Sequence, residues 1–360
     1  MAHRFCLLWL VLTCLAASLP SPVRAQPPPV PPCPSGAAAG PADTHLYFVT
    51  TRLAACAAGQ IKFGETRGAV TFGRMERGRP PRLIPVTQPE ADWLAGLRAD
   101  LANHRGRVLI YVHGYLNSFD DAVSRAQTLR QQSSVAGPIL IFSWPSENCA
   151  ACYTRDEENA LWTQIYFDRL LTLLLQEPAV DEIVLLGHSM GNRILLRSIA
   201  ESDRSLTALS RQRIRNIVLA APDVDRTIVE RDYVAVLDRP GRTTTIYASR
   251  ADSALRVSWK VHGYPRAGDT ACRILDLGTG ASLPRCLLGL RAGGSVTLVD
   301  TSRVSAGAGH RDFVESRAAA ADLCRVLEGR TVFPGRDPMV GHPGAVLLTN
   351  GALSPADCPR

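Results

Sequence analysis

The amino-acid sequence predicts an α/β domain with a mostly parallel central sheet of about eight strands flanked by helices. Short apolar runs rich in β-branched residues recur along the 360 residues. Helical patterns fall between these runs, and such alternation is typical of parallel βαβ units. Several runs are almost continuously apolar, such as residues 183–186, which indicates central strands covered on both faces.

These patterns predict eight strands and five main helices. The strands are expected at residues 46–52, 69–75, 108–112, 138–142, 182–187, 216–220, 243–248 and 295–300. The helices are expected at residues 89–104, 119–132, 159–176, 193–200 and 311–327. The second helix opens with Asp120 and Asp121, whose negative charges favour a helix N-terminus through the helix dipole.

The two ends of the chain differ from this domain in composition. Residues 1–25 combine a basic start, a short apolar stretch and small residues before a cleavage point after Ala25, which predicts a secretory signal peptide. The residues before Cys14 match a lipobox poorly, which argues against lipoprotein anchoring. The Pro/Ala/Gly-rich residues 26–42 are expected to form a linker. Residues 43–330 are expected to form the α/β domain, and residues 331–360 an irregular C-terminal tail.

Eight cysteines remain after the expected cleavage. They are Cys33, Cys56, Cys149, Cys152, Cys272, Cys286, Cys324 and Cys358. An even number in an exported chain predicts disulfides, one of which would pin the tail through Cys358. The Cys149–Cys152 spacing also suits a redox or metal site, but a second pair at metal-ligand spacing and a thioredoxin-like setting are missing. We therefore expect an exported protein, periplasmic or secreted.

The composition excludes several classes of protein. Hydrophobic residues make up 46% and charged residues 20%, as in globular proteins. The formal net charge is +7, but the basic residues are scattered and not interleaved with aromatics, which argues against a nucleic-acid partner. No segment after the signal peptide is long and apolar enough for a membrane helix.

A candidate nucleophile lies in the sequence Gly187-His188-Ser189-Met190-Gly191. The G-x-S-x-G pattern alone is weak, but here it follows an apolar strand and precedes a helix. That setting is the one a nucleophile elbow requires, where a tight turn lifts the serine hydroxyl clear of the sheet. An ordinary strand-to-helix turn with a small residue is the plain alternative. We predict that Ser189 is the nucleophile of an α/β-hydrolase fold.

A second motif, His113-Gly114-Tyr115, follows the third predicted strand. In this fold the loop after that strand and the residue after the nucleophile each supply an N–H to the oxyanion hole. These donors are expected to be Tyr115 and Met190. His113 precedes the serine, whereas the order in this fold is serine, acid, histidine, so we interpret it as a residue that structures the loop.

Three histidines follow the elbow and are candidates for the base: His262, His310 and His342. His310 follows the last strand and precedes the final helix, where the base belongs. His262 ends a helical stretch and His342 lies in the tail, so either is expected to be a surface or packing residue. We predict that His310 is the base.

The acid is open between three aspartates. Asp252 follows the strand at 243–248, the usual position of the third triad member. Asp223 and Asp225 follow the preceding strand and would instead cap a helix that begins near Arg226. We predict that Asp252 is the acid, which would hold the imidazole in the right tautomer.

Several motifs together resemble a bacterial α/β-hydrolase family of unknown function that is often labelled only esterase- or lipase-like. The matching pieces are residues 47–52, the 113–115 loop, the Phe-Ser-Trp-Pro-Ser run at 142–146, Tyr153, Asp156, the elbow at 187–191, residues 219–225 and 249–255, and Gly309-His310. The resemblance covers about residues 46–327 and implies the fold and hydrolase chemistry. It implies no substrate.

We therefore expect a serine hydrolase that cleaves small-molecule carboxylic esters through Ser189, His310 and Asp252 by way of an acyl-enzyme. No cofactor or metal is expected. An acyltransferase or peptidase with the same triad is the alternative within enzymes. A non-catalytic envelope binding protein on a hydrolase scaffold is the alternative from another class, because the fold alone does not fix the function.

Overall fold

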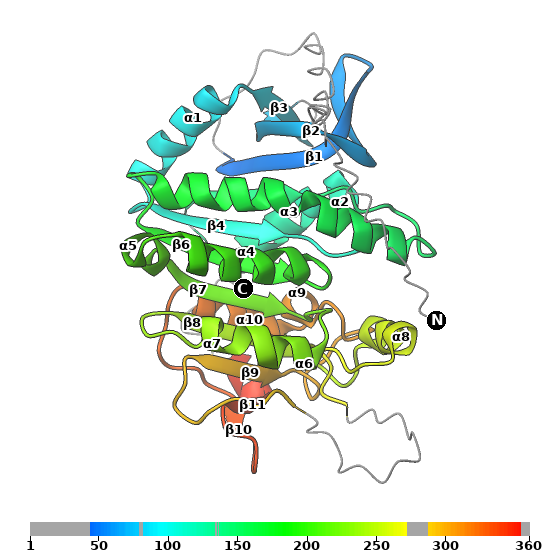
Figure 1. Cartoon of the computed structure of the whole chain (residues 1–360), viewed down its shortest axis with the longest axis vertical. Coiled ribbons are helices and arrows are strands. Elements are labelled where there is room, and N and C mark those ends of the chain that lie inside the picture. Colours follow the sequence, from blue (N-terminus) through cyan, green and yellow to red (C-terminus); the bar gives the residue numbers. More distant parts are fainter. Residues whose placement is uncertain (1–43, 79–81, 134, 136, 272–286, 354–360) are drawn as a thin grey trace, which may run out of the picture.

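The computed structural model describes residues 44–78, 82–133, 135, 137–271 and 287–353. An eleven-stranded sheet runs through this part of the chain in the order β10-β11-β9-β8-β7-β6-β4-β5-β1-β2-β3 (Figure 1). The expected signal peptide and linker, and Cys33, Cys272, Cys286 and Cys358, lie outside the described residues.

The centre of the sheet is parallel and its two edges are antiparallel. The parallel strands are β1 (Leu46–Ala57), β5 (Ile139–Ser143), β4 (Arg107–Val112), β6 (Glu182–His188), β7 (Ile214–Ala220), β8 (Thr243–Ala248), β9 (Val296–Asp300) and β11 (Ala345–Leu348). At one edge β2 (Gln60–Gly78) and β3 (Arg82–Gln88) run antiparallel, and at the other β10 (Arg336–Pro338) pairs antiparallel with β11. The predicted mostly parallel sheet is confirmed, and each of the eight predicted strands is present.

The sheet has more strands than the eight expected. β3 lacks alternation in burial because all its residues after Arg82 are half-buried, so its sequence carries no clear period of two. β10 and β11 have only 3 and 4 residues and lie between glycines and prolines. The interpretation of residues 331–360 as an irregular tail is therefore wrong for the described part, because backbone pairing with β9 orders it.

Helices cover both faces of the sheet (Figure 1). Helices α1 (Glu90–Ala102), α3 (Tyr153–Gln176) and α4 (Gly191–Ser205) bury apolar side chains in one core cluster, which also takes Leu237 of α7 (Val234–Leu237). Helices α2 (Phe119–Ser133) and α10 (Arg317–Leu327) do so in a second cluster on the other face. This two-faced burial explains the nearly continuous apolar runs of the central strands.

Shorter helices lie in the connections. They are α5 (Ala208–Gln212), α6 (Arg226–Ile228), the π-helix η1 (Val229–Tyr233), α8 (Ser253–His262), α9 (Asp312–Glu315) and the 3₁₀-helix η2 (Asn350–Leu353). The final predicted helix is interrupted at Ser316, whose hydroxyl accepts a hydrogen bond from the N–H of Ala319 and so caps α10. None of the described helices is long and apolar enough to cross a membrane.

Candidate active site

Ser189 lies on the turn between β6 and α4 with a left-handed backbone, φ 50°. This conformation is costly for a residue other than glycine and is maintained by its surroundings. The Ser189 N–H donates to the Ala220 carbonyl at 2.9 Å. A Cβ atom at Gly191 would lie 2.3 Å from the His113 carbonyl oxygen, so that position requires glycine. The predicted strand, turn and helix around the serine are thus present, at the carboxyl edge of the parallel strands.

His310 and Asp252 meet at the same edge of the sheet. His310 lies in the connection from β9 to α9, and its Nδ1 is 2.8 Å from Oδ2 of Asp252, which follows β8. The other Asp252 oxygen accepts the N–H of Leu255 at 2.8 Å and caps α8. Asp252 is fully buried, so both of its oxygens are committed to defined donors.

The electrostatics of this pair favour a protonated imidazole. Burial lowers the pKa of His310, but the charge of Asp252 and the hydrogen bond to it outweigh burial, and the pKa is raised above its ordinary value. An acid that stabilises the imidazolium in this way is what a Ser-His-Asp mechanism requires.

The structure does not join Ser189 to His310 by a hydrogen bond within the described residues. The imidazole of His310 lies beside that of His188, the residue before the nucleophile, with ring centroids 4.9 Å apart. His188 Nε2 is also 3.1 Å from the His310 carbonyl oxygen. His310 is therefore held next to the elbow. Nucleophile-to-base hydrogen bonds are often long without substrate and tighten when it binds.

The loop after β4 packs against Ser189. A Cβ atom at Gly114 would lie 2.8 Å from the Cβ of Ser189, so the backbone approaches the serine closely. Among the described residues, the backbone N–H groups of Tyr115 and Met190 have no hydrogen-bond acceptor. Free N–H groups on both segments that flank the serine are what an oxyanion hole requires.

His113 structures this loop. Its Nδ1 donates to the Gly114 carbonyl at 2.8 Å, and its ring stacks on Trp144 with centroids 5.2 Å apart. Burial, with the charge of Arg52, lowers the pKa of His113 to about 3, so it stays neutral. Because the Gly114 carbonyl and the Tyr115 N–H belong to one planar trans peptide, fixing the carbonyl aims the N–H the opposite way.

Arg52 holds the loop after β4 through hydrogen bonds. Its buried guanidinium donates to the Asn117 carbonyl at 2.6 Å, the Ser146 carbonyl at 3.0 Å and the Ser143 hydroxyl at 2.9 Å. Burial lowers its pKa to about 10, which leaves it positively charged at neutral pH. Arg52 thus places a positive charge next to the loop that carries Tyr115. In the described part of the chain this charge has no ion-pair partner.

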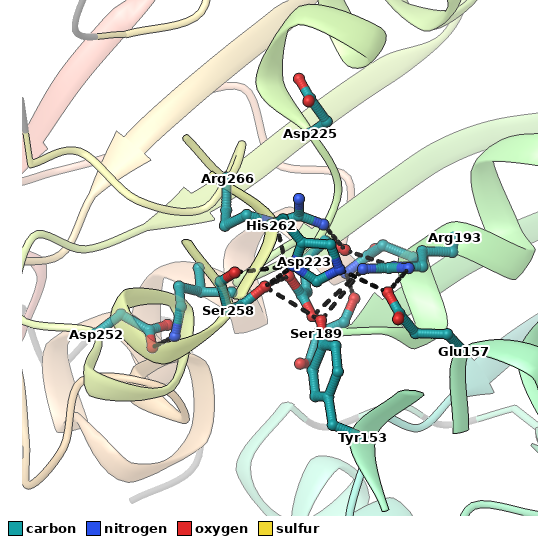
Figure 2. Close-up of polar contacts among 12 residues, drawn as sticks. Tyr153, Glu157, Ser189, Arg193, Asp223, Asp225, Asp252, Ser258, His262 and Arg266 are labelled. Carbon is teal, nitrogen blue, oxygen red and sulfur yellow. Dashed lines mark hydrogen bonds and ion pairs between the residues drawn. The ribbon is translucent and has the colours of Figure 1, made fainter. Parts of the chain in front are cut away.

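An ionic cluster centred on the buried Asp223 lies beside Ser189 (Figure 2). At its centre, Asp223 accepts hydrogen bonds from the Arg266 Nε at 2.8 Å, the Ser258 hydroxyl at 2.5 Å and the Tyr153 hydroxyl. The Asp223 N–H donates to the Ser189 carbonyl at 3.2 Å. Burial raises the pKa of Asp223, but the nearby Arg266 and Arg193 outweigh this and lower it to about 2.

The helix-capping interpretation holds for one of the two aspartates. Asp225 accepts the N–H of Thr227 at 2.7 Å and caps α6 as predicted. For Asp223 the interpretation is wrong, because its carboxylate is fully engaged by the side chains of the cluster. Figure 2 shows Asp225 apart from the cluster and pointing away from Ser189.

The cluster reaches the loop after β4 through Tyr153. Its ring packs edge-on against Tyr115 with centroids 5.2 Å apart. The Tyr115 hydroxyl donates to the carbonyls of Cys149 and Ala150, at 3.0 and 2.6 Å. Cys149 and Cys152 form a disulfide in this same segment, just before α3 begins. The Cys149–Cys152 pair is thus a disulfide, and it adjoins the site.

A family model for alpha/beta hydrolases of unknown function (DUF900) matches residues 90–316, a span that contains every residue of this site except Arg52. The chain belongs to this family. The chain is also similar to a crystal structure of a predicted CIB-like hydrolase from Thermoplasma acidophilum, at 12% identity and a TM-score of 0.32, over 72% of this chain and 91% of that one. No curated protein matches the chain.

The family assignment agrees with the resemblance inferred from the sequence motifs, and the predicted α/β-hydrolase fold is confirmed. Sequence reasoning missed the cluster of Arg193, Ser258 and Arg266 around Asp223. The signal was Asp223 itself, which stands in one of the matching motifs, directly after a strand at the carboxyl edge. Its partners come from separate elements, so spacing along the chain did not reveal them.

A cavity of about 420 Å³ adjoins the cluster. Ser189 is not among the residues that line it. The cavity wall combines charged and apolar side chains. The apolar residues come from α3, α4 and the connection after β7, and beside them lie Arg193, Arg197, Glu157 and His262. His262 is part of this wall, since its Nε2 lies 2.8 Å from Glu157, whereas His342 lies between β10 and β11.

Proposed function

We propose that this chain is an exported serine hydrolase that cleaves carboxylic esters of small molecules through Ser189, His310 and Asp252. The observation that carries the proposal is the 2.8 Å contact between His310 and Asp252 beside a serine on a strained elbow. The contact leaves Nε2 of His310 as the nitrogen available to the substrate side. Family membership supports hydrolase chemistry in general.

The mechanism follows from these groups. His310 Nε2 takes the Ser189 proton as the hydroxyl oxygen attacks the ester carbonyl carbon, and Asp252 stabilises the imidazolium. The N–H groups of Tyr115 and Met190 bind the oxyanion, a contribution of about 3–4 kcal/mol for one such donor. His310 then protonates the leaving alkoxide. Water, deprotonated by the same imidazole, attacks the acyl-enzyme and releases the acid.

Export is supported by the signal-like residues 1–25 and by oxidised cysteines. Besides the Cys149–Cys152 bond, Cys56 and Cys324 are each disulfide-bonded. Stable disulfides are typical of oxidising compartments and rare in the cytosol.

Short acyl groups suit the surroundings best. The sequence between β7 and the acid has no long apolar lid that would cover a long alkyl chain. We therefore propose a preference for short-acyl esters over long-chain triglycerides.

Hydrolysis of p-nitrophenyl esters of increasing acyl length tests this function, with Ser189→Ala as the control. We expect rates that fall as the chain lengthens and that vanish in Ser189→Ala. A maximum at long chains would refute the substrate preference alone. Activity that persists in Ser189→Ala would refute the proposed mechanism. Faster turnover with added alcohols or amines, with acyl transfer to them, would favour an acyltransferase.

A further inference from the structure

A second cluster of potential ligand groups lies far from Ser189, at the opposite edge of the sheet. It consists of His45, just before β1, and of Asp100 and His104 on and after α1. β1 runs parallel to β5, β4 and β6, and Ser189 follows the carboxyl end of β6 whereas His45 precedes the amino end of β1. The cluster therefore has no part in the chemistry of Ser189.

The three side chains converge closely. His45 Nδ1 lies 2.8 and 2.9 Å from the two Asp100 oxygens, and His104 Nδ1 lies 3.0 Å from Oδ1 of Asp100. One ligand atom from each residue lies within 4.8 Å of the other two. Asp100 lies in the last turn of α1 and His104 just after its end, where His104 Nδ1 is also 2.8 Å from the main-chain carbonyl oxygen of Asp100.

The donor set matches a transition-metal ion. Two imidazoles and one carboxylate suit Zn²⁺ and its neighbours, whereas Mg²⁺ and Ca²⁺ prefer oxygen ligands. Zn²⁺ holds N and O ligands at about 2.0–2.2 Å, which sets neighbouring ligands of a tetrahedral ion about 3.3 Å apart. To bind such an ion, the two distances from imidazole Nδ1 to an Asp100 oxygen need to increase by only a few tenths of an ångström. The two imidazoles need to move toward each other.

Burial and exposure also suit a metal site. The Asp100 side chain is 9% exposed, while those of His45 and His104 are 36% and 18% exposed. An ion can thus reach the site and retain water in its fourth position. Arg130 lies nearby, with its guanidinium on the carbonyls of His45, Val135 and Gly137. Its charge opposes a second cation, so we expect moderate affinity.

We propose that His45, Asp100 and His104 bind one Zn²⁺ ion or a similar divalent transition metal. The ion would link the start of the domain to α1 and would stabilise the fold rather than take part in catalysis. In its absence the two imidazoles donate from Nδ1 to Asp100, so binding requires each of these protons to move to Nε2, and protonation of the imidazoles at acidic pH weakens binding. Sequence reasoning expected no metal, because the predicted serine-hydrolase mechanism needs none.

Calorimetric titration of the tag-free, metal-stripped exported protein with ZnCl₂ tests the proposal. We expect one ion per chain, a dissociation constant in the micromolar range, a higher melting temperature with Zn²⁺, and visible absorption bands with Co²⁺. Asp100→Asn and His104→Gln should each weaken binding at least about tenfold, the scale on which even outer partners of a metal site act. His342→Gln, the same change at a histidine outside the cluster, should bind like the parent.

Unchanged stoichiometry and affinity in both cluster variants would overturn the proposal, as would the absence of binding tighter than about 0.1 mM in the parent. In that case the cluster is a hydrogen-bonded support only. Melting curves without metal show whether each variant folds. If Asp100→Asn or His104→Gln fails to fold, His45→Gln takes its place, because His45 is the most exposed of the three ligands. Binding is measured without substrate, so its failure is independent of the proposed esterase function.

Discussion

Replacing Asp252 by Asn separates the proposed catalytic role of that residue from its structural role. The wild-type carboxylate accepts from Nδ1 of His310 with one oxygen and from the Leu255 N–H with the other. Asparagine caps helices about as well as aspartate, so its oxygen can keep the bond to Leu255. Its NH₂ group then faces the imidazole, and Nδ1 must accept instead of donate.

The expected loss follows from the tautomer. With Nδ1 as acceptor, the proton moves to Nε2, which can no longer take the proton of Ser189. The corresponding change in a serine protease lowered kcat about 10⁴-fold, or about 5 kcal/mol of transition-state stabilisation. We expect a fall in kcat of at least about a hundredfold here. The melting temperature should shift by less than about 4 °C, which corresponds to about 1 kcal/mol in a domain of this size.

Steady-state kinetics with a short-chain ester and a thermal melt of the same preparation provide the test. Asp252→Ala is the matched control, because it removes the cap as well and should lower both kcat and the melting temperature. Near-normal turnover in Asp252→Asn would refute the assignment of the acid. If Asp223→Asn then lost activity without losing stability, the acid would move to the earlier strand.

Five further outcomes follow from the structure and the sequence. Because Asp252 raises the pKa of His310, kcat/KM should rise with pH through a single ionisation whose pKa lies above the ordinary histidine value. In Asp252→Asn this apparent pKa should be lower. The same pair should stabilise the fold below the ordinary histidine pKa and lose that contribution as pH rises through the raised value, which pH-dependent melts measure. Asp223→Asn should destabilise the protein by about 3–5 kcal/mol, since it leaves the buried Arg266 without its ionic partner, whereas Asp225→Ala should cost only about 1 kcal/mol as a lost cap, both by denaturant unfolding. Reducing the Cys149–Cys152 disulfide should lower kcat by loosening the segment on which Tyr115 rests, and a double Cys→Ser variant should match the reduced enzyme; equal rates would show that the disulfide is only structural. Intact-mass analysis of the exported form should find a chain that no longer begins at Met1.

The sequence predicted the centre of the fold well because burial dominates there. Strands β4 to β9 are covered on both faces, and their apolar runs and the intervening helices are visible in the residues alone. The edges were harder to predict. β10 and β11 are too short to show a period, and their order comes from backbone bonds to a neighbour rather than from side-chain pattern.

The candidate site divides in the same way. Ser189, His310 and Asp252 stand in a fixed order and in fixed positions after strands, so chain order was enough to bring them together as candidates. Arg52 and Arg266 gave no such signal. Each contacts segments that are distant in the sequence. The sequence has 40 lysines and arginines, and nothing in it distinguishes the few that are buried from the many that are exposed.

Labelling with a fluorophosphonate probe, followed by peptide mapping, tests the central claim most directly. The probe reacts with a serine only when a base activates it and donors hold the phosphoryl oxygen, so it requires the whole arrangement of elbow, His310 and oxyanion hole to be functional. We predict one adduct per chain, on Ser189, that is absent in Ser189→Ala and strongly slowed in His310→Gln. An unlabelled wild-type protein, or an adduct that persists in Ser189→Ala, would contradict the account.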